Sequence, residues 1–159
     1  MRANLPHRVY VATMQVFGEE GRQKVARHRD LRAGKGFVTL EQTKDLEKII
    51  CDTPREQTAI LLECLMNLAA NEMFAGEVHD LDALEKKMVS GLIRLAEQAH
   101  TLVIVTGQVG EDGISYEKET ADYIRLMGRI NQAAAAMADC VIQAVCGIAV
   151  VRKERKEQT

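Results

Sequence analysis

The basic segment Gly21–Arg32 carries one histidine, His28, among several permanent cations. In a helix, residues four apart stack above one another, so Lys24, His28 and Arg32 are expected on one face. Like charges favour the neutral imidazole, and a neutral ring beside cations can attack phosphorus while the cations hold a polyphosphate. The alternative is a solvated basic helix face on which the histidine has no chemical role.

Two further features follow apolar runs of the kind that form buried strands. Glu63 comes directly after the run 59–62. An acid at the carboxyl end of a parallel strand commonly serves a metal-bound phosphate or holds a base or ribose, while the alternative is a cap for the helix predicted from Leu65. The Gly-rich loop 106–113 either lets a ligand approach the backbone or simply forms turns. We expect the basic helix, Glu63 and this loop at the same edge of the sheet.

The elements that must position these residues indicate an α/β fold. Strands are predicted at 9–13, 37–41, 59–63, 102–106, 141–145 and 148–151. The runs 59–63 and 102–106 are expected to be buried on both faces. Helices are predicted at 19–30, 65–74, 81–99 and 119–138, with a short helix ending at Ile50 and capped by Thr43 or Asp45. This alternation predicts a mainly parallel sheet flanked by helices.

Composition and charge are those of an ordinary globular protein. The 159 residues suffice for one domain with a real core, and we expect the segment 153–159 to form a charged tail. A net charge of −2 argues against non-specific nucleic-acid binding. No apolar run approaches the roughly 20 residues of a membrane span, and no signal-peptide segment precedes the first strand. We therefore expect a cytoplasmic protein whose four cysteines are free thiols.

Five elements of the chain resemble, in order, those of a known enzyme family. They are Tyr10-Val-Ala-Thr13, Lys24-Val-Ala-Arg-His28-Arg-Asp-Leu-Arg32, Leu61-Leu-Glu-Cys-Leu65, Val105-Thr-Gly-Gln-Val-Gly110 and Gly128-Arg-Ile-Asn-Gln132. The ending Gly147-Ile-Ala-Val150 is also similar. On these elements the chain resembles the bifunctional adenosylcobinamide kinase / adenosylcobinamide-phosphate guanylyltransferase family of cobalamin biosynthesis.

The resemblance implies a single-domain P-loop NTPase-like protein that forms a homotrimer. The family phosphorylates adenosylcobinamide with ATP or GTP, and then transfers GMP from GTP to that phosphate through a guanylyl-histidine. His28 matches this histidine, with Arg27, Arg29 and Arg32 as candidates to hold phosphates and Mg²⁺ to neutralise the leaving pyrophosphate. The implied GTP contacts are Met14, Gln15, Val16, Leu31, Arg32, Ala33, Gly34, Glu41 and Glu63.

The chain departs from the family's pattern at two places. The family begins with a strand, a GxxxxGK(S/T) loop and a helix, but only residues 1–7 precede the first strand here, and the motif is absent. Gly107-Gln108 stands where the family usually has Asn-Glu. We expect an N-terminally truncated chain: an internal start of a longer product, a decayed copy with impaired activity, or a catalytically silent paralogue that binds nucleotide or corrinoid. The kinase step is expected to suffer more, since it depends on positioned phosphate ligands.

Overall fold

The computed structural model describes residues 5–16, 18–74, 80–110 and 114–155. Strands and helices alternate along these ranges, as the sequence predicts. The strands are β1 (His7–Ala12), β2 (Phe37–Glu41), β3 (Thr58–Glu63), β4 (Thr101–Val105), β5 (Cys140–Val145) and β6 (Ile148–Glu154). The α-helices are α1 (Gly18–Arg32), α2 (Leu65–Met73), α3 (Leu81–Glu97) and α4 (Lys118–Met137), and the 3₁₀ helices are η1 (Leu46–Lys48) and η2 (Arg55–Gln57).

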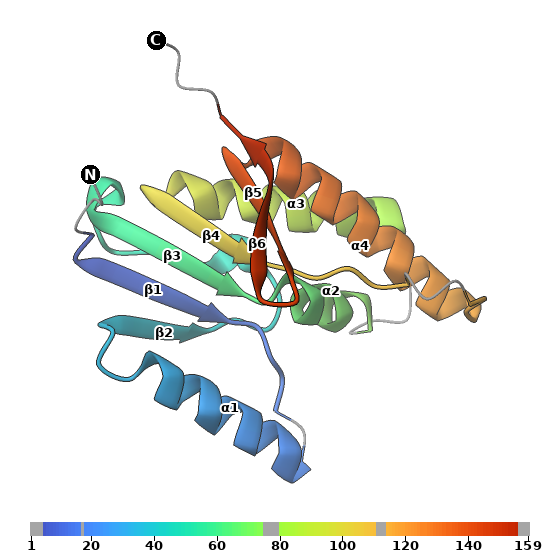
Figure 1. The fold of residues 1–159 in the computed structure, drawn as a ribbon, viewed down its shortest axis with the longest axis horizontal. Helices are drawn as coiled ribbons and strands as arrows, with labels where there is room; N and C mark the ends of the chain where they lie inside the picture. Colours follow the sequence, from blue (N-terminus) through green and yellow to red (C-terminus); the bar gives the residue numbers. More distant parts are fainter. Residues whose placement is uncertain (1–4, 17, 75–79, 111–113, 156–159) are drawn as a thin grey trace.

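Four strands form one parallel sheet in the order β2-β1-β3-β4 (Figure 1). Ala12 at the end of β1 lies between Glu41 of β2 and Glu63 of β3. The carboxyl ends of the strands therefore meet at one edge, where open α/β sheets bind ligands. β5 and β6 pair separately as an antiparallel hairpin that turns at Cys146 and Gly147, both at positive φ. The α/β fold with a mainly parallel sheet flanked by helices is confirmed.

One face of the sheet carries the hydrophobic core. Val11, Ile60 and Leu62 point to this face and have at most 1% of their surface exposed. Helices α2, α3 and α4 lie together on this side of the sheet, while α1 lies apart from these helices, beside β2 (Figure 1). The buried leucine, isoleucine and methionine side chains of these helices are Leu65, Leu68, Met73, Met88, Leu92, Leu95, Leu126, Met127 and Ile130. In α3 they recur three and four residues apart, which is the spacing of a single apolar helix face.

The other face of the sheet is only partly covered. The expectation that 59–63 and 102–106 are buried on both faces is therefore wrong. In β3, Leu61 is half-buried, and in the edge strand β4, Val103 and Val105 are 49% and 39% exposed. β3 pairs in register with β4 on one side and with β1 on the other, so this face is continuous with the one that α1 approaches. Unbroken apolar runs carry no alternation, and so the sequence could not reveal which face stays open.

The segment after β2 also differs from expectation. It forms one 3₁₀ turn, Leu46–Lys48, instead of a helix that reaches Ile50, and its N-cap residue Asp45 makes no side-chain capping bond. Asp45 instead adopts the left-handed conformation, with φ of 56°.

At the other end of the chain, β6 extends to Glu154, so the first residues of the expected tail 153–159 belong to a strand. Residues 156–159 lie outside the described part of the chain. Within the described ranges, no helix combines the length and apolar character that a membrane crossing requires.

Candidate functional site

Helix α1 presents a narrow face to the sheet. Its half-buried residues are Gly21, Val25, His28 and Arg32, and none of its residues is fully buried. Their spacing of four, three and four residues confirms a helical face that includes His28 and Arg32. Lys24 lies one turn before His28 on the same side of the helix, as expected, but its side chain is exposed to solvent.

Two consecutive residues of α1 contact the two glutamates that end β2 and β3. His28 Nδ1 lies 3.3 Å from Glu63 Oε1, and Arg29 donates to Glu41 Oε1 at 3.1 Å. The side chains of the first pair are 41% and 29% exposed, against 64% and 69% for the second. Since exposed ion pairs contribute little, the contact between His28 and Glu63 is the more specific of the two.

The contacts of Glu63 argue against one of its two alternatives, the capping role. Helix α2 has Cys64 as its N-cap, and no side chain caps its first turn. Glu63 instead accepts a hydrogen bond from Tyr10 and lies against His28. Its carboxylate therefore belongs to the site at the carboxyl edge and does not cap the helix.

Tyr10 is a site residue that sequence reasoning did not single out. Its hydroxyl donates to Glu63 Oε2 at 2.7 Å and lies 3.5 Å from His28 Nδ1. Burial, together with the hydrogen bond to Glu63, raises the pKa of Tyr10 well above its usual range, so the phenol stays a donor. Its position in the strand could have indicated this role. Tyr10 lies two residues before the end of β1, so it shares a sheet face with Ala12 and Glu63.

Two of the cations expected beside His28 make contacts with other groups. Lys24 pairs with Glu20 at 2.7 Å, and the Arg32 guanidinium lies 3.6 Å from the centre of the Tyr10 ring. The anionic group in contact with His28 is the carboxylate of Glu63, beside the Tyr10 hydroxyl. A carboxylate at Nδ1 orients the ring and stabilises positive charge that develops on it when Nε2 forms a bond.

A hollow of about 530 Å³ opens where α1 ends and β2 begins. It is lined by Arg29, Arg32, Ala33, Gly34, Gly36, Phe37 and Thr39. Three of the expected GTP contacts, Arg32, Ala33 and Gly34, are among these residues, whereas Leu31 is not and is 57% exposed. Two guanidinium groups in one hollow suit a polyanionic ligand.

The expected contacts 14–16 continue β1 beyond the sheet edge. Met14 and Gln15 are half-buried, and Val16 is 49% exposed. Val16 packs beside the start of α1, because a Cβ on Gly21 would lie 3.5 Å from Val16 Cγ1. In the part of the chain that the structure describes, no hydrogen bond or ion pair joins 14–16 to His28.

The Gly-rich loop after β4 lies at the same edge but contacts α4. Thr106 Oγ1 donates to Asn131 Oδ1 at 2.8 Å, and Asn131 Nδ2 donates to the Gly107 carbonyl at 3.1 Å. A Cβ on Gly107 would lie 2.4 Å from Met66 Sδ, so Met66 occupies the space that a larger residue at 107 would need. Residues 111–113 of the predicted loop lie outside the described residues.

Metal ligands do not converge on this site. Among the described residues, no three His, Cys, Asp or Glu side chains come together in a way that could hold an ion. The described side chains therefore do not fit a metal held by protein ligands alone.

The chain is an α/β protein whose four-stranded parallel sheet, flanked by helices, is consistent with a P-loop NTPase-like fold, and a histidine, two glutamates and two arginines lie at and beside the carboxyl edge of that sheet. Residues 1–151 match the family model of cobinamide kinase / cobinamide phosphate guanyltransferase, and the chain belongs to this family. This confirms the resemblance drawn from the five sequence elements.

Two relatives give the extent of the similarity. The chain is 33% identical, over 156 residues, to the bifunctional adenosylcobalamin biosynthesis protein CobU of Salmonella typhimurium. The aligned region covers 91% of this chain and 85% of that protein. It is 30% identical, over 153 residues, to the protein of the same name from Escherichia coli, with 89% and 83% covered.

Proposed function

We propose that this chain transfers GMP from GTP to adenosylcobinamide phosphate through a covalent guanylyl-histidine at His28. Membership of the cobinamide kinase / cobinamide phosphate guanyltransferase family supports the reaction class. The observation that carries the assignment is the contact of His28 Nδ1 with Glu63, because it leaves Nε2 as the nitrogen that can act as nucleophile.

The transfer consists of two displacements at the α-phosphorus. In the first, His28 Nε2 forms a bond to the α-phosphorus of GTP, the bond from phosphorus to the bridging oxygen breaks, and pyrophosphate leaves. In the second, a phosphate oxygen of adenosylcobinamide phosphate attacks, the phosphorus–nitrogen bond breaks, and His28 is regenerated. Glu63, which accepts a hydrogen bond from Tyr10, stabilises the positive charge on the ring between the two steps.

The hollow beside α1 supports a binding site for the nucleotide. Arg29 and Arg32 line it and supply the positive charge that phosphates require. We propose that the GTP contacts are Arg32, Ala33 and Gly34 in this hollow, with Met14, Gln15, Val16, Leu31, Glu41 and Glu63 around it. We expect Mg²⁺ to be bound chiefly by the phosphates, as is usual for nucleotide sites.

The kinase activity is the second half of the proposal. The aminopropanol hydroxyl of adenosylcobinamide attacks the γ-phosphorus of ATP or GTP, the bond to the bridging oxygen breaks, and ADP or GDP leaves. The names of the two bifunctional relatives and the family description support this step. Its measurement is the appearance of adenosylcobinamide phosphate from adenosylcobinamide and ATP.

Labelling with GTP that carries a labelled α-phosphate tests the histidine. We expect wild-type protein, incubated with this GTP and Mg²⁺, to take up label that is labile to acid and stable to alkali. His28→Ala abolishes the label, while His100→Ala, an exposed histidine after α3, keeps it. Labelled wild type with equal label on His28→Ala contradicts the assignment. GTP binding without any label supports instead a catalytically silent nucleotide- or corrinoid-binding protein.

We propose three further properties, of which the first two are implied by the family resemblance and the third by the absence of an apolar membrane-spanning or signal-peptide run in the sequence. The protein is expected to be a homotrimer, to act on adenosylcobinamide and its phosphate, and to reside in the cytoplasm. Sedimentation equilibrium tests the first, binding titration with adenosylcobinamide tests the second, and cell fractionation tests the third.

A further inference from the structure

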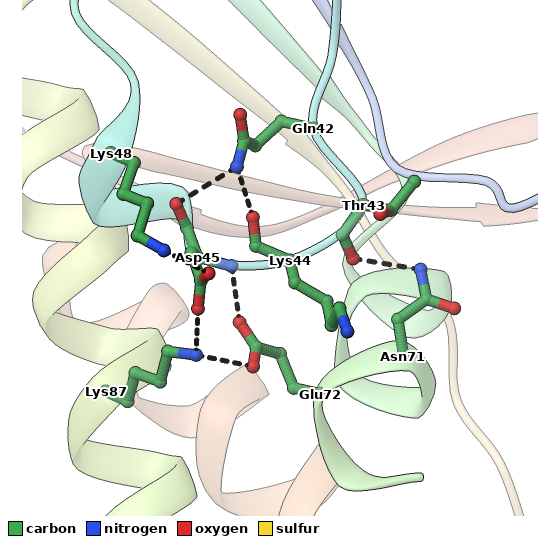
Figure 2. Close-up of polar contacts among 8 residues, drawn as sticks. All are labelled: Gln42, Thr43, Lys44, Asp45, Lys48, Asn71, Glu72 and Lys87. Carbon is green, nitrogen blue, oxygen red and sulfur yellow. Dashed lines mark hydrogen bonds and ion pairs between the residues drawn. The ribbon is translucent and has the colours of Figure 1, made fainter. Parts of the chain in front are cut away.

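Asn71, on helix α2, joins the segments that leave two neighbouring strands. Its side-chain Nδ2 donates to the carbonyl of Thr13 at 2.8 Å and to the carbonyl of Thr43 at 3.0 Å. Figure 2 shows the second of these bonds, with Asn71 reaching up from α2 to the chain after β2. Thr13 directly follows β1 and Thr43 follows β2 by two residues. An amide nitrogen with two N–H groups can serve both carbonyls at once.

Thr13 is in turn bonded to the end of the third strand. It is fully buried, and its hydroxyl donates to the Cys64 carbonyl and accepts from the Cys64 N–H, both at 2.8 Å. Cys64 directly follows Glu63, the carboxylate that contacts His28. The exits of β1, β2 and β3 are therefore joined by side-chain hydrogen bonds, with Asn71 as the link to β2.

The residue next to Asn71 holds the same segment through charge. Glu72 is 8% exposed, accepts from the Asp45 N–H at 2.6 Å and pairs with Lys87 Nζ at 2.6 Å. Lys87 also pairs with Asp45, whose other carboxylate oxygen pairs with Lys48 at 2.7 Å (Figure 2). Helix α2 thus holds segment 43–45 at two points, which leaves little freedom for the chain just after Glu41.

We propose that Asn71 is a positioning residue for the nucleotide: it sets the distance between segment 14–16 and Glu41, both expected GTP contacts. This inference rests on the proposed function. Met14 adjoins the Thr13 carbonyl, and Glu41 lies two residues before the Thr43 carbonyl. Loss of the amide leaves the backbone bond from the Gln42 N–H to the Ala12 carbonyl as the direct tie between the two exits, which loosens the spacing of these groups. A displacement of about 1 Å in a preorganised site can lower the reaction rate by on the order of 100-fold.

The test uses two variants at Asn71 and one matched control. Asn71→Ala removes both donors, and Asn71→Asp keeps the size of the side chain but offers oxygens to two carbonyls. The control is Gln98→Ala. Gln98 also bridges two backbone groups, since it accepts from the Cys51 N–H at 2.8 Å and donates to the Ile49 carbonyl at 3.0 Å, but it lies toward the amino edge of the sheet.

Amide hydrogen exchange and GTP titration are the readouts. We expect both Asn71 variants to exchange faster at 13–16 and 42–45 and to bind GTP about tenfold more weakly. Gln98→Ala is expected to speed exchange at 49–51 and to leave GTP affinity unchanged. Exchange or affinity at wild-type values in both Asn71 variants overturns the inference, as does an equal loss of affinity in Gln98→Ala.

The same measurements distinguish a failure of the proposed function from a failure of the positioning role of Asn71. If wild type binds GTP but takes no label on His28, while the Asn71 variants bind GTP more weakly, then guanylyl transfer is wrong and the positioning role stands. If wild type is labelled and the Asn71 variants match it in exchange and affinity, then guanylyl transfer stands and the positioning role is wrong. A wild-type chain that binds no GTP overturns both.

Discussion

At the scale of residues, the carboxylate of Glu63 is held in place before any substrate binds. One of its oxygens accepts from Tyr10 at 2.7 Å, and the other lies 3.3 Å from His28 Nδ1. The Tyr10 ring is in turn covered by Arg32 and meets the edge of Phe37 at 6.3 Å between ring centres. A preorganised carboxylate stabilises charge that develops on the imidazole without first having to reorient.

Glu63→Gln tests this arrangement with almost no change of shape. A glutamine can donate to Nδ1 and so favour the tautomer that carries its proton on Nε2, which blocks attack. We expect the rate of His28 labelling at saturating GTP to fall by about 10- to 100-fold. Glu20→Gln is the control, because Glu20 pairs with the exposed Lys24 on the same helix. Equal rates for Glu63→Gln and wild type would contradict an orienting role for Glu63.

At the scale of elements, the segment between β2 and β3 is ordered by side chains where regular backbone bonding is lacking. Asp45 has a left-handed backbone and sits among Lys48, Lys87 and Glu72. Gln42 adds hydrogen bonds to the carbonyls of residues 44 and 45. This segment begins directly after Glu41, so its stability bears on the site as well as on the fold.

Asp45 makes the stability of this segment sensitive to acid. Its hydrogen bonds with Lys48 and Lys87 lower the pKa of Asp45 to about 2. Because this folded pKa is below the unfolded value of about 3.9, the carboxylate stabilises the fold above that value, and the stabilisation is lost as the pH falls towards 2.

Asp45→Asn retains a residue that tolerates the left-handed conformation. We expect this variant to be less stable than wild type at pH 7, by a margin that shrinks as the pH falls below about 4. Urea unfolding between pH 7 and pH 3 measures the margin. A margin that is constant across this range would show that the charge of Asp45 does not contribute.

At the scale of the whole molecule, the two faces of the sheet differ in cover. Leu62 is fully buried under the helices, whereas its neighbour Leu61 points to the opposite face and is only half-buried. That face also holds Tyr10 and Glu63 near α1, and the exposed Val103 of β4 further along. The site therefore lies on the more open face, with a packed core directly behind it.

Paired truncations in β3 measure this asymmetry. Leu62→Ala is expected to lower the free energy of unfolding by about 2–5 kcal/mol, the range for a buried leucine. Leu61→Ala removes the same atoms from a half-buried position and should cost less than half as much. Chemical denaturation of both variants gives the comparison. Equal costs would mean that the second face is covered in solution, for example by another copy of the chain.

Much of the local structure was predictable, because it depends on short-range pattern. The strand at 37–41 was correct to the residue, and α3 and α4 were placed within a few residues, since apolar spacing and flanking Gly or Asp residues mark them. The 3₁₀ turn at Leu46–Lys48 was missed because Asp45 is held by Glu72 and Lys87, which are distant in sequence.

The sequence by itself determined the fold class and the family, because periodicity and ordered motifs are carried by neighbouring residues, and it made His28 the candidate nucleophile. Only the tertiary structure revealed that Tyr10 and Glu63 lie against His28. It likewise revealed Asn71 as the link between two strand exits. These contacts join residues 18 to 58 positions apart. Their geometry depends on strand register and helix packing, which no local pattern encodes.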